Sequence, residues 1–327
     1  MPPELQDLQT PQTPPEAPVQ RSPYLGLAAL GLIGAASFFA VFAYFDALPP
    51  AASQTAAAAT KQSAFDGISI QAKAAIVIDL NSGTVLYEKN ADQQLPLASI
   101  TKVPLALSVS EVLDPDRVIT IPYDTGYTEG GQRLLQGERW KIRDVMHFTL
   151  VASSNEGAQI LAEVADADLR ALYASSTPGS AALWRMNDLA RSLGLRQSHF
   201  SNVSGLDIST TEAGAYGTAR DMAKLFAYAA TARPGIFAGT ARDGLLLTDT
   251  SGGTTAAYNT NLALGEIPGL IMGKTGYTDL AGGNLGVVFD AGLSQPIVAV
   301  VLGSTWQGRF EDMKLLVETA RRDITGE

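Results

Sequence analysis

Ser99 and Lys102 stand three positions apart where a loop leads into an apolar run, QLPLASITKVPLAL. Residues three apart on a helix share a face, so the lysine amine can approach the serine hydroxyl. That hydroxyl is a poor nucleophile near neutral pH and needs a base, and lysine can serve when burial and nearby cations lower its pKa. The spacing therefore suggests nucleophilic acyl transfer. In isolation it also fits a serine that caps a helix beside an exposed lysine.

Two further motifs favour the chemical interpretation. Ser153-Ser154-Asn155 follows the apolar helical pattern IRDVMHFTLVA, and Lys274-Thr275-Gly276 ends a strand-like run. The patterns S-x-x-K, S-x-N and K-T-G each occur once, in that order. Three ordered matches are hard to explain as coincidence.

With these motifs the chain resembles the low-molecular-mass penicillin-binding proteins that act as serine-type D-alanyl-D-alanine carboxypeptidases. The likeness runs from about residue 72 to residue 322. Beyond the three motifs it includes HFSN at 199–202, GLD at 205–207, TARDMA at 218–223, NTN at 259–261 and KTGYTDLAG at 274–282.

The resemblance implies a role for each motif residue. Ser99 would be the acylated nucleophile, Lys102 its proton acceptor, and Ser153 a proton relay to the departing D-alanine. Asn155 would bind Lys102 or the substrate. The oxyanion hole would consist of the backbone N–H groups of Ser99 and Tyr277. The remaining substrate-binding residues would be Lys274, Thr275, Gly276 and Thr278, with the carboxylate held by Lys274, Thr275 and Thr278.

The resemblance also implies partners. The substrate would be a peptidoglycan stem peptide, β-lactam antibiotics would act as covalent inhibitors, and neither a cofactor nor a metal would be needed. The sequence departs from the family at three places. It stops soon after Arg322, where many relatives continue into a β-rich domain and a terminal membrane helix. Ser154 replaces a smaller residue and is expected to crowd the cleft slightly. Whether Arg309 replaces a carboxylate-binding arginine of the family stays open.

Composition removes several other classes of function. The 327 residues include no cysteine, which excludes thiolate nucleophiles, cysteine-based zinc sites and disulfides. A net charge of −10 without a long basic run argues against nucleic-acid binding. The two histidines, His147 and His199, lack metal-binding spacing and are interpreted as structural.

The N-terminal part suggests a membrane anchor. Residues 1–22 are rich in proline and glutamine and are expected to form a disordered cytoplasmic tail. Residues 23–45 carry no charge and are long enough to cross a hydrocarbon layer of roughly 30 Å. A cleaved signal peptide is the main alternative, but its apolar stretch is usually about 7–15 residues long. Residues 46–66 are interpreted as a linker, and residues 67–327 as an extracytoplasmic catalytic domain.

Periodicity indicates the fold of that domain. Residues 72–80 and 84–89 form a hairpin pattern, and strand-like runs return at 270–275, 283–289 and 297–302. Helical patterns lie between them at 99–113, 142–164, 183–193 and 218–230, and another closes the chain at 309–322. We therefore expect a mixed α/β (α+β) fold, resembling β-lactamases and transpeptidases. It has an antiparallel sheet flanked by helices and an inserted all-helical subdomain.

Three alternatives to the carboxypeptidase remain. A close variant is an endopeptidase that cuts cross-links. A β-lactamase would share the trio but needs a water-activating glutamate, and no E-x-x-L-N run lies between Asn155 and Lys274. A catalytically silent wall-binding protein is disfavoured because every motif position is intact.

Overall fold

Strands from the beginning and the end of the folded region build one five-stranded antiparallel sheet, in the order β10-β11-β12-β1-β2. The computed structural model describes residues 63–128, 131–292 and 294–326. Apolar residues fill the central strands and turn residues separate them, as the hairpin and strand patterns predicted. The strands are β1 (Ala74–Asp79), β2 (Val85–Lys89), β10 (Leu270–Thr278), β11 (Gly282–Asp290) and β12 (Pro296–Ser304).

Helices cover both faces of this sheet. The amphipathic helix α8 (Gly308–Thr325) packs Phe310, Met313 and Leu316 against side chains of β1, β11 and β12 in one buried cluster. On the opposite face lies α6 (Ala219–Ala232), whose Phe226 ring is so close to β11 that a side chain at Gly286 would collide with it. Burial on both faces explains why β11 and β12 are nearly continuous apolar runs rather than alternating ones.

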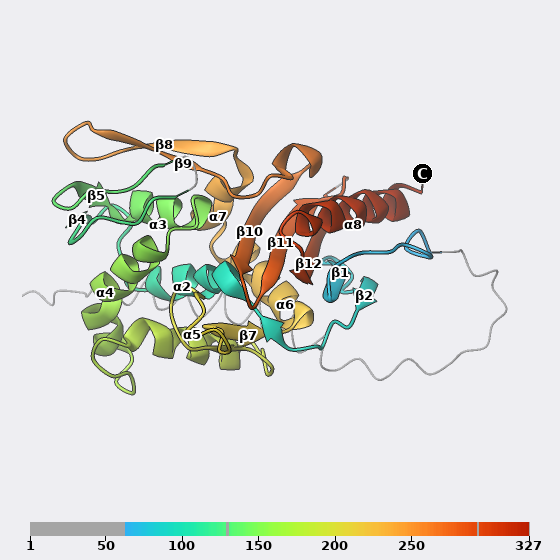
Figure 1. The fold of residues 1–327 in the computed structure, drawn as a ribbon, viewed down its shortest axis with the longest axis horizontal. Coiled ribbons are helices and arrows are strands. Elements are labelled where there is room, and N and C mark those ends of the chain that lie inside the picture. The colour runs from blue at the N-terminus through green and yellow to red at the C-terminus, as the bar shows by residue number, and fades with distance from the viewer. Residues whose placement is uncertain (1–62, 129–130, 293, 327) are drawn as a thin grey trace, which may run out of the picture. The chain divides into compact units, whose positions relative to one another are not determined.

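The residues between β2 and β10 form a mainly helical insertion (Figure 1). Its first helix, α2 (Lys102–Val109), follows the short 3-10 helix η1 (Ala98–Thr101), is buried along its whole length and contacts most of the other helices of the insertion. Besides α6, the other α-helices are α3 (Ile142–Val151), α4 (Asn155–Leu172), α5 (Ala181–Ser192) and α7 (Pro234–Phe237). η1 packs against β10, which is an edge strand of the sheet. The junction of insertion and sheet is therefore where residues from the three motifs can meet.

The insertion differs from the sequence expectation in two respects. The predicted helix at 142–164 is broken, because Ser153 adopts a left-handed conformation (φ 59°) that ends α3 and lets α4 start in a new direction. The insertion is also not all helical. It contains the antiparallel pairs β4–β5 and β8–β9 and the small sheet β3-β7-β6. These strands are β3 (Leu95–Pro96), β4 (Val118–Thr120), β5 (Arg139–Lys141), β6 (His199–Phe200), β7 (Ala215–Gly217), β8 (Gly244–Thr248) and β9 (Thr254–Tyr258).

The folded domain begins earlier than residue 67. Phe65 is buried in the cluster under α8 and stacks on Tyr87 at 5.5 Å between ring centroids, so the last residues of the predicted linker belong to the domain. The predicted tail (1–22) and membrane segment (23–45) lie outside the described residues. Among the residues that are described, no helix combines the length and apolarity needed to cross a membrane.

Candidate active site

Ser99 and Lys102 are in direct contact, as their spacing predicted. Ser99 lies in η1 and Lys102 begins α2, and the lysine Nζ is 2.7 Å from the serine Oγ. Two more acceptors surround the same amine, Asn155 Oδ1 at 2.7 Å and the Ser204 backbone carbonyl at 2.9 Å. The competing interpretation, a capping serine beside an exposed lysine, is wrong. Lys102 has no exposed surface, and no side chain caps η1 or α2.

Burial gives Lys102 the properties of a base. Loss of solvation lowers the pKa of its amine to about 7, and the Glu156 carboxylate opposes this shift. From the sequence we expected nearby cations to contribute to the lowering of the Lys102 pKa, whereas burial is the principal cause. A substantial fraction of the amine is therefore neutral near pH 7 and able to take a proton from a hydroxyl 2.7 Å away.

Ser153 and Lys274 form a second hydroxyl–amine pair. The Lys274 Nζ donates to Ser153 Oγ at 2.8 Å and to the Thr275 carbonyl at 3.1 Å. The left-handed turn that breaks the helix at Ser153 puts Asn155 at the first residue of α4, where it contacts Lys102. Residues 153–155 thus connect both amines. Burial lowers the pKa of Lys274 well below its usual value, and repulsion from Lys102 and Arg309 acts in the same direction.

Ser154, the middle residue of S-x-N, does not crowd the cleft. Its hydroxyl turns back and accepts a hydrogen bond from the Gly157 N–H at 3.0 Å, so that it caps the N-terminus of α4. The side chain is buried, with 3% of its surface exposed. The expectation of crowding is therefore wrong, because the capping bond keeps this hydroxyl on the helix.

The threonines after Lys274 differ in their surroundings. Thr275 is buried and its hydroxyl bonds to that of Thr260. The Thr278 hydroxyl donates to Asp207 Oδ1 at 2.9 Å and accepts from the Ala281 N–H at 3.2 Å. Thr278 therefore links β10 to the loop that holds Asp207. Its predicted contact with a substrate carboxylate stays a prediction.

Gly276 brings the edge strand against the nucleophile. A methyl group built on Gly276 would lie 2.8 Å from the Leu97 carbonyl oxygen and 3.1 Å from the Ser99 nitrogen. A larger residue would push the two backbones apart. The close approach places the peptide that follows Gly276, which carries the Tyr277 N–H, beside the backbone of Ser99. Two backbone donors next to a nucleophile are the arrangement that stabilises an oxyanion in acyl transfer.

The structure adds residues that the motifs did not identify. Ser204 accepts from Lys102, and Glu156 opposes the lowering of its pKa. The fully buried Asn284 of β11 donates to the Pro96 carbonyl at 2.9 Å and accepts from the Gly303 N–H at 2.8 Å, which ties the segment before Ser99 to the sheet. Glu156 follows S-x-N directly, so proximity in sequence was a usable signal for it. The contacts of Asn284 join segments far apart in the chain and left no local pattern.

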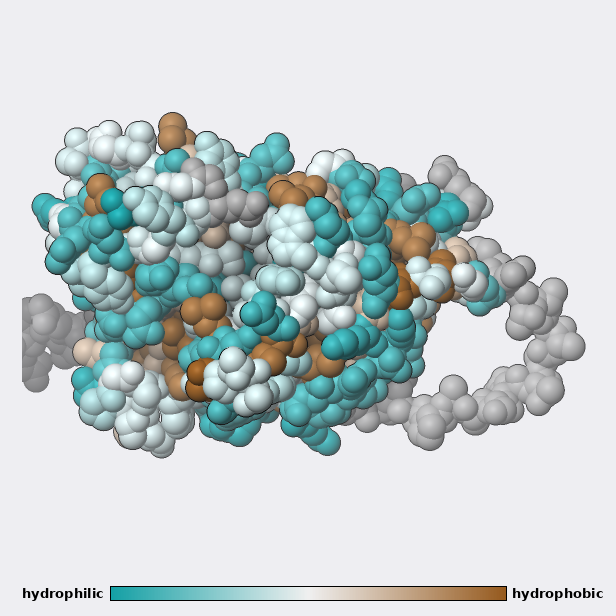
Figure 2. Space-filling model, in the orientation of Figure 1, coloured by the Kyte–Doolittle hydropathy of each residue, from teal (hydrophilic) through white to brown (hydrophobic). Residues whose placement is uncertain are grey.

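Nothing in the described part of the chain suggests a metal centre. No group of three or more histidine, cysteine, aspartate or glutamate side chains there is arranged to hold an ion. His147 packs in α3 near Gly235, and its burial lowers its pKa. The face seen in Figure 2 is mainly hydrophilic or neutral, with smaller hydrophobic areas between. The groups gathered around Ser99 are the amines of Lys102 and Lys274, the Ser153 hydroxyl and backbone donors.

Comparison with known proteins agrees with this geometry. The family model described as Peptidase_S11, D-alanyl-D-alanine carboxypeptidase, matches residues 56–305. Similar curated proteins include the D-alanyl-D-alanine carboxypeptidases DacF of Bacillus subtilis and DacA of Escherichia coli. Both are 29% identical to this chain, over 64% and 76% of its length. The chain spans 51% of the length of the first and 60% of the second.

Solved structures show the same fold. The ampicillin-bound penicillin-binding protein D2 of Listeria monocytogenes is 27% identical, with a TM-score of 0.63 over 77% of this chain and 98% of that one. A D-alanyl-D-alanine carboxypeptidase of Mycobacterium tuberculosis is 25% identical, with a TM-score of 0.64 over 77% of this chain and 92% of that one. The expected transpeptidase-like α/β architecture is confirmed.

Proposed function

Since the chain belongs to the D-alanyl-D-alanine carboxypeptidase family of peptidases, we propose that it removes the terminal D-alanine from peptidoglycan stem peptides through an ester on Ser99. The observation that carries this proposal is the contact between Ser99 and Lys102. The hydroxyl lies 2.7 Å from an amine that has no exposed surface and a pKa of about 7. A buried amine of this kind is what a serine needs in order to attack an amide near neutral pH.

In the first step, Ser99 Oγ attacks the carbonyl carbon of the penultimate D-alanine while its proton passes to the Lys102 amine. The carbonyl oxygen becomes an oxyanion, which would be held by the N–H groups of Ser99 and Tyr277. The contact between Gly276 and the Ser99 backbone supports this role. Asn155 Oδ1 and the Ser204 carbonyl would orient the amine and stabilise it once protonated.

In the second step the peptide C–N bond breaks, and the departing nitrogen must gain a proton. The proton that Lys102 took from Ser99 would reach it through the Ser153 hydroxyl, which Lys274 Nζ orients from 2.8 Å. Lys274, Thr275 and Thr278 would hold the carboxylate of the departing D-alanine, which offers the buried Lys274 a counter-ion. Water then hydrolyses the Ser99 ester and releases the shortened peptide.

β-Lactam antibiotics would enter the same pathway as covalent inhibitors. Their strained amide presents a carbonyl to Ser99 and a carboxylate to Lys274, and the ampicillin-bound relative supports this expectation. An endopeptidase acting on cross-links would use the same residues and would differ in the group that leaves. Attack on a D-alanyl bond is common to both.

We also propose that the protein is anchored in the membrane with its catalytic domain outside the cytoplasm. Residues 23–45 would anchor the protein in the cytoplasmic membrane, residues 1–22 would form a cytoplasmic tail, and residues 46–62 would form the linker to an extracytoplasmic catalytic domain. The charge-free sequence of 23–45 supports this arrangement, and peptidoglycan lies on that side of the membrane. Protease added to intact spheroplasts should digest the catalytic domain. A mature protein that begins after Leu48 would show that the segment is a cleaved signal instead.

Release of D-alanine from a purified muropeptide pentapeptide tests the activity directly. The wild-type protein should release one D-alanine per peptide, and Ser99→Ala should release none while keeping its circular dichroism spectrum. Mass spectrometry after incubation with penicillin should find one long-lived adduct on Ser99. Rapid turnover of the drug would indicate a β-lactamase, and a protein that forms no adduct would contradict the enzymatic proposal.

A further inference from the structure

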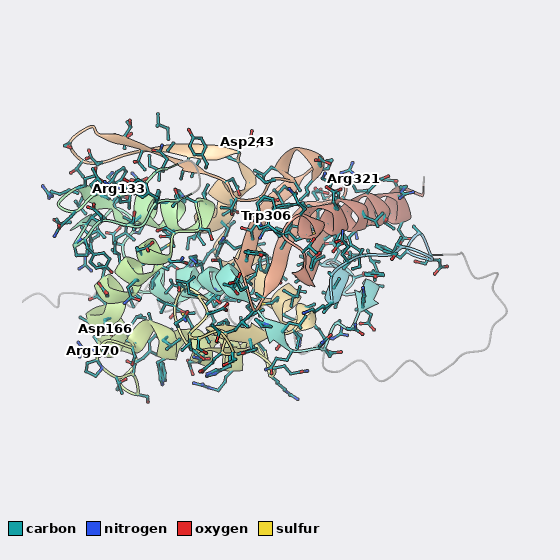
Figure 3. All side chains as sticks on the ribbon, viewed as in Figure 1. Arg133, Asp166, Arg170, Asp243, Trp306 and Arg321 are labelled. Atoms are coloured by element: carbon teal, nitrogen blue, oxygen red, sulfur yellow. The ribbon has the colours of Figure 1, made fainter. Side chains whose placement is uncertain are left out.

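Arg309 is a buried cation that contacts the backbone of β10 next to the candidate site. It lies in the first turn of α8, and only 4% of its surface is exposed. Its Nη1 donates to the Gly276 carbonyl at 2.9 Å. Its guanidinium carbon lies 4.6 Å from the centroid of the Phe310 ring and 5.4 Å from that of Trp306, which is labelled just before α8 in Figure 3. The aromatic rings and the backbone bond hold the guanidinium in place.

The carbonyl that Arg309 holds belongs to the peptide that carries the Tyr277 N–H. No peptide bond of the described residues is cis, so the C=O and N–H of this unit point in opposite directions within one plane. Arg309 approaches from the β11 side, since its Cβ lies 3.2 Å from a methyl built on Gly283, the residue that pairs with Tyr277. The Tyr277 N–H is therefore directed to the opposite side, toward the outer edge of the sheet, and η1 contacts this same strand.

On the proposed function, this peptide supplies one of the two oxyanion donors. A cation that bonds to an amide oxygen draws electron density from the amide and makes its N–H a stronger donor, and burial prevents solvent from screening the effect. The same bond fixes the plane of the peptide, and with it the direction of the N–H. A donor fixed before the reaction needs no reorganisation when the oxyanion forms.

We propose that Arg309 is a positioning residue of the oxyanion hole, which holds and polarises the Gly276–Tyr277 peptide from behind. This role differs from that of an arginine that binds the substrate carboxylate. In this structure Arg309 is buried and its Nη1 is bonded to the backbone. The two roles predict different substrate dependence, because an oxyanion forms on every acyl donor whether or not the donor carries a carboxylate.

Arg309→Met removes the cation and keeps an unbranched apolar side chain, and Arg322→Met removes an exposed arginine of the same helix as a control. Both are compared with wild type in acylation by two thioester donors, one with a terminal carboxylate and one with its methyl ester. Arg309→Met should acylate at least tenfold more slowly with both donors, chiefly through the maximal rate and with little change in the half-saturating concentration. The control should acylate as wild type does. A loss confined to the carboxylate-bearing donor would overturn the proposal in favour of carboxylate binding.

A second measurement reads the oxyanion hole itself. The acyl-enzyme formed with penicillin labelled with ¹³C at its reactive carbonyl has an ester stretch in infrared difference spectra. Weaker hydrogen bonding in Arg309→Met should move that stretch to higher wavenumber, and an unchanged stretch would overturn the proposal. Should Arg309→Met fail to fold, Arg309→Lys replaces it in the same measurement. An ammonium lacks the planar fork of a guanidinium, so the ester stretch of Arg309→Lys should also lie at higher wavenumber than that of wild type, by a smaller amount. A wild-type protein that forms no penicillin adduct would contradict the proposed function instead.

Discussion

The Lys102 amine lies 2.7 Å from the Ser99 hydroxyl oxygen and has no exposed surface of its own. Hydrogen bonds to Asn155 and to the Ser204 carbonyl fix the amine from two further sides. The lysine cannot turn out to solvent without breaking all three bonds, so the site is held ready for proton transfer before a substrate arrives. The pH dependence of the acylation rate should therefore depend on the charges near this amine.

Glu156→Gln should shift the acid limb of the acylation rate profile to lower pH. The Glu156 carboxylate stabilises the ammonium form of Lys102 and so raises its pKa, against the larger effect of burial. Without that carboxylate the pKa falls, and the neutral base is present at lower pH. The measurement is the rate of acylation by penicillin from pH 5 to pH 9. Glu163→Gln, on the same helix α4, is the control and should leave the profile unchanged, and a shift to higher pH in Glu156→Gln would contradict the account.

Gly276→Ala should slow acylation by roughly tenfold to a hundredfold, because small displacements of reacting groups cost rates of that order. The added methyl would lie 2.8 Å from the Leu97 carbonyl oxygen and 3.1 Å from the Ser99 nitrogen, so the edge strand must move away from the nucleophile. Gly235→Ala is a matched control, since its methyl meets no atom within 4 Å. Equal acylation rates for the two variants would show that the contact has no role in the reaction.

Ser154→Ala separates stability from catalysis. Loss of its capping bond to the Gly157 N–H should lower the free energy of unfolding by about 0.5–2 kcal/mol. Urea denaturation measures this change, and acylation of the folded variant should match wild type because the hydroxyl faces its own helix. Ser180→Ala serves as the comparison, since Ser180 makes no side-chain capping bond to α5. An acylation defect in Ser154→Ala would mean that the hydroxyl has a role in the cleft.

Local sequence patterns were sufficient to predict the contact between Ser99 and Lys102 and the strands of the main sheet. The i, i+3 spacing of Ser99 and Lys102 on a buried helix start brings them together by geometry alone. β11 and β12 can be recognised in the sequence as apolar runs, because their burial on both faces leaves few polar positions. The K-T-G residues occupy β10, where the strand-like pattern predicted them.

What the sequence did not reveal depends on contacts between distant segments or on unusual backbone. Neither proline nor glycine marks the end of α3, because a serine adopts the left-handed conformation there. β9 is rich in threonine and alanine, and β8 is a short leucine run that is largely exposed or half-buried, so neither shows the alternation of apolar and polar residues that identifies a strand. The bond from Thr278 to Asp207 and the bond from Arg309 to Gly276 each cross between elements. Residue type alone could not assign either partner.

Acylation of Ser99 as proposed requires Lys102 as the base, and the acylation rate of Lys102→Arg against pH tests this requirement. Arginine keeps the charge and approximate length, but its guanidinium stays protonated and cannot accept the Ser99 proton. We expect wild-type acylation to fall as pH decreases through about 7, the pKa that burial gives Lys102. We expect Lys102→Arg to acylate at least about a hundredfold more slowly at every pH. Lys314→Arg, on the surface of α8, should match wild type. A folded Lys102→Arg that acylates as fast as wild type would contradict the account and assign the proton of Ser99 to another base.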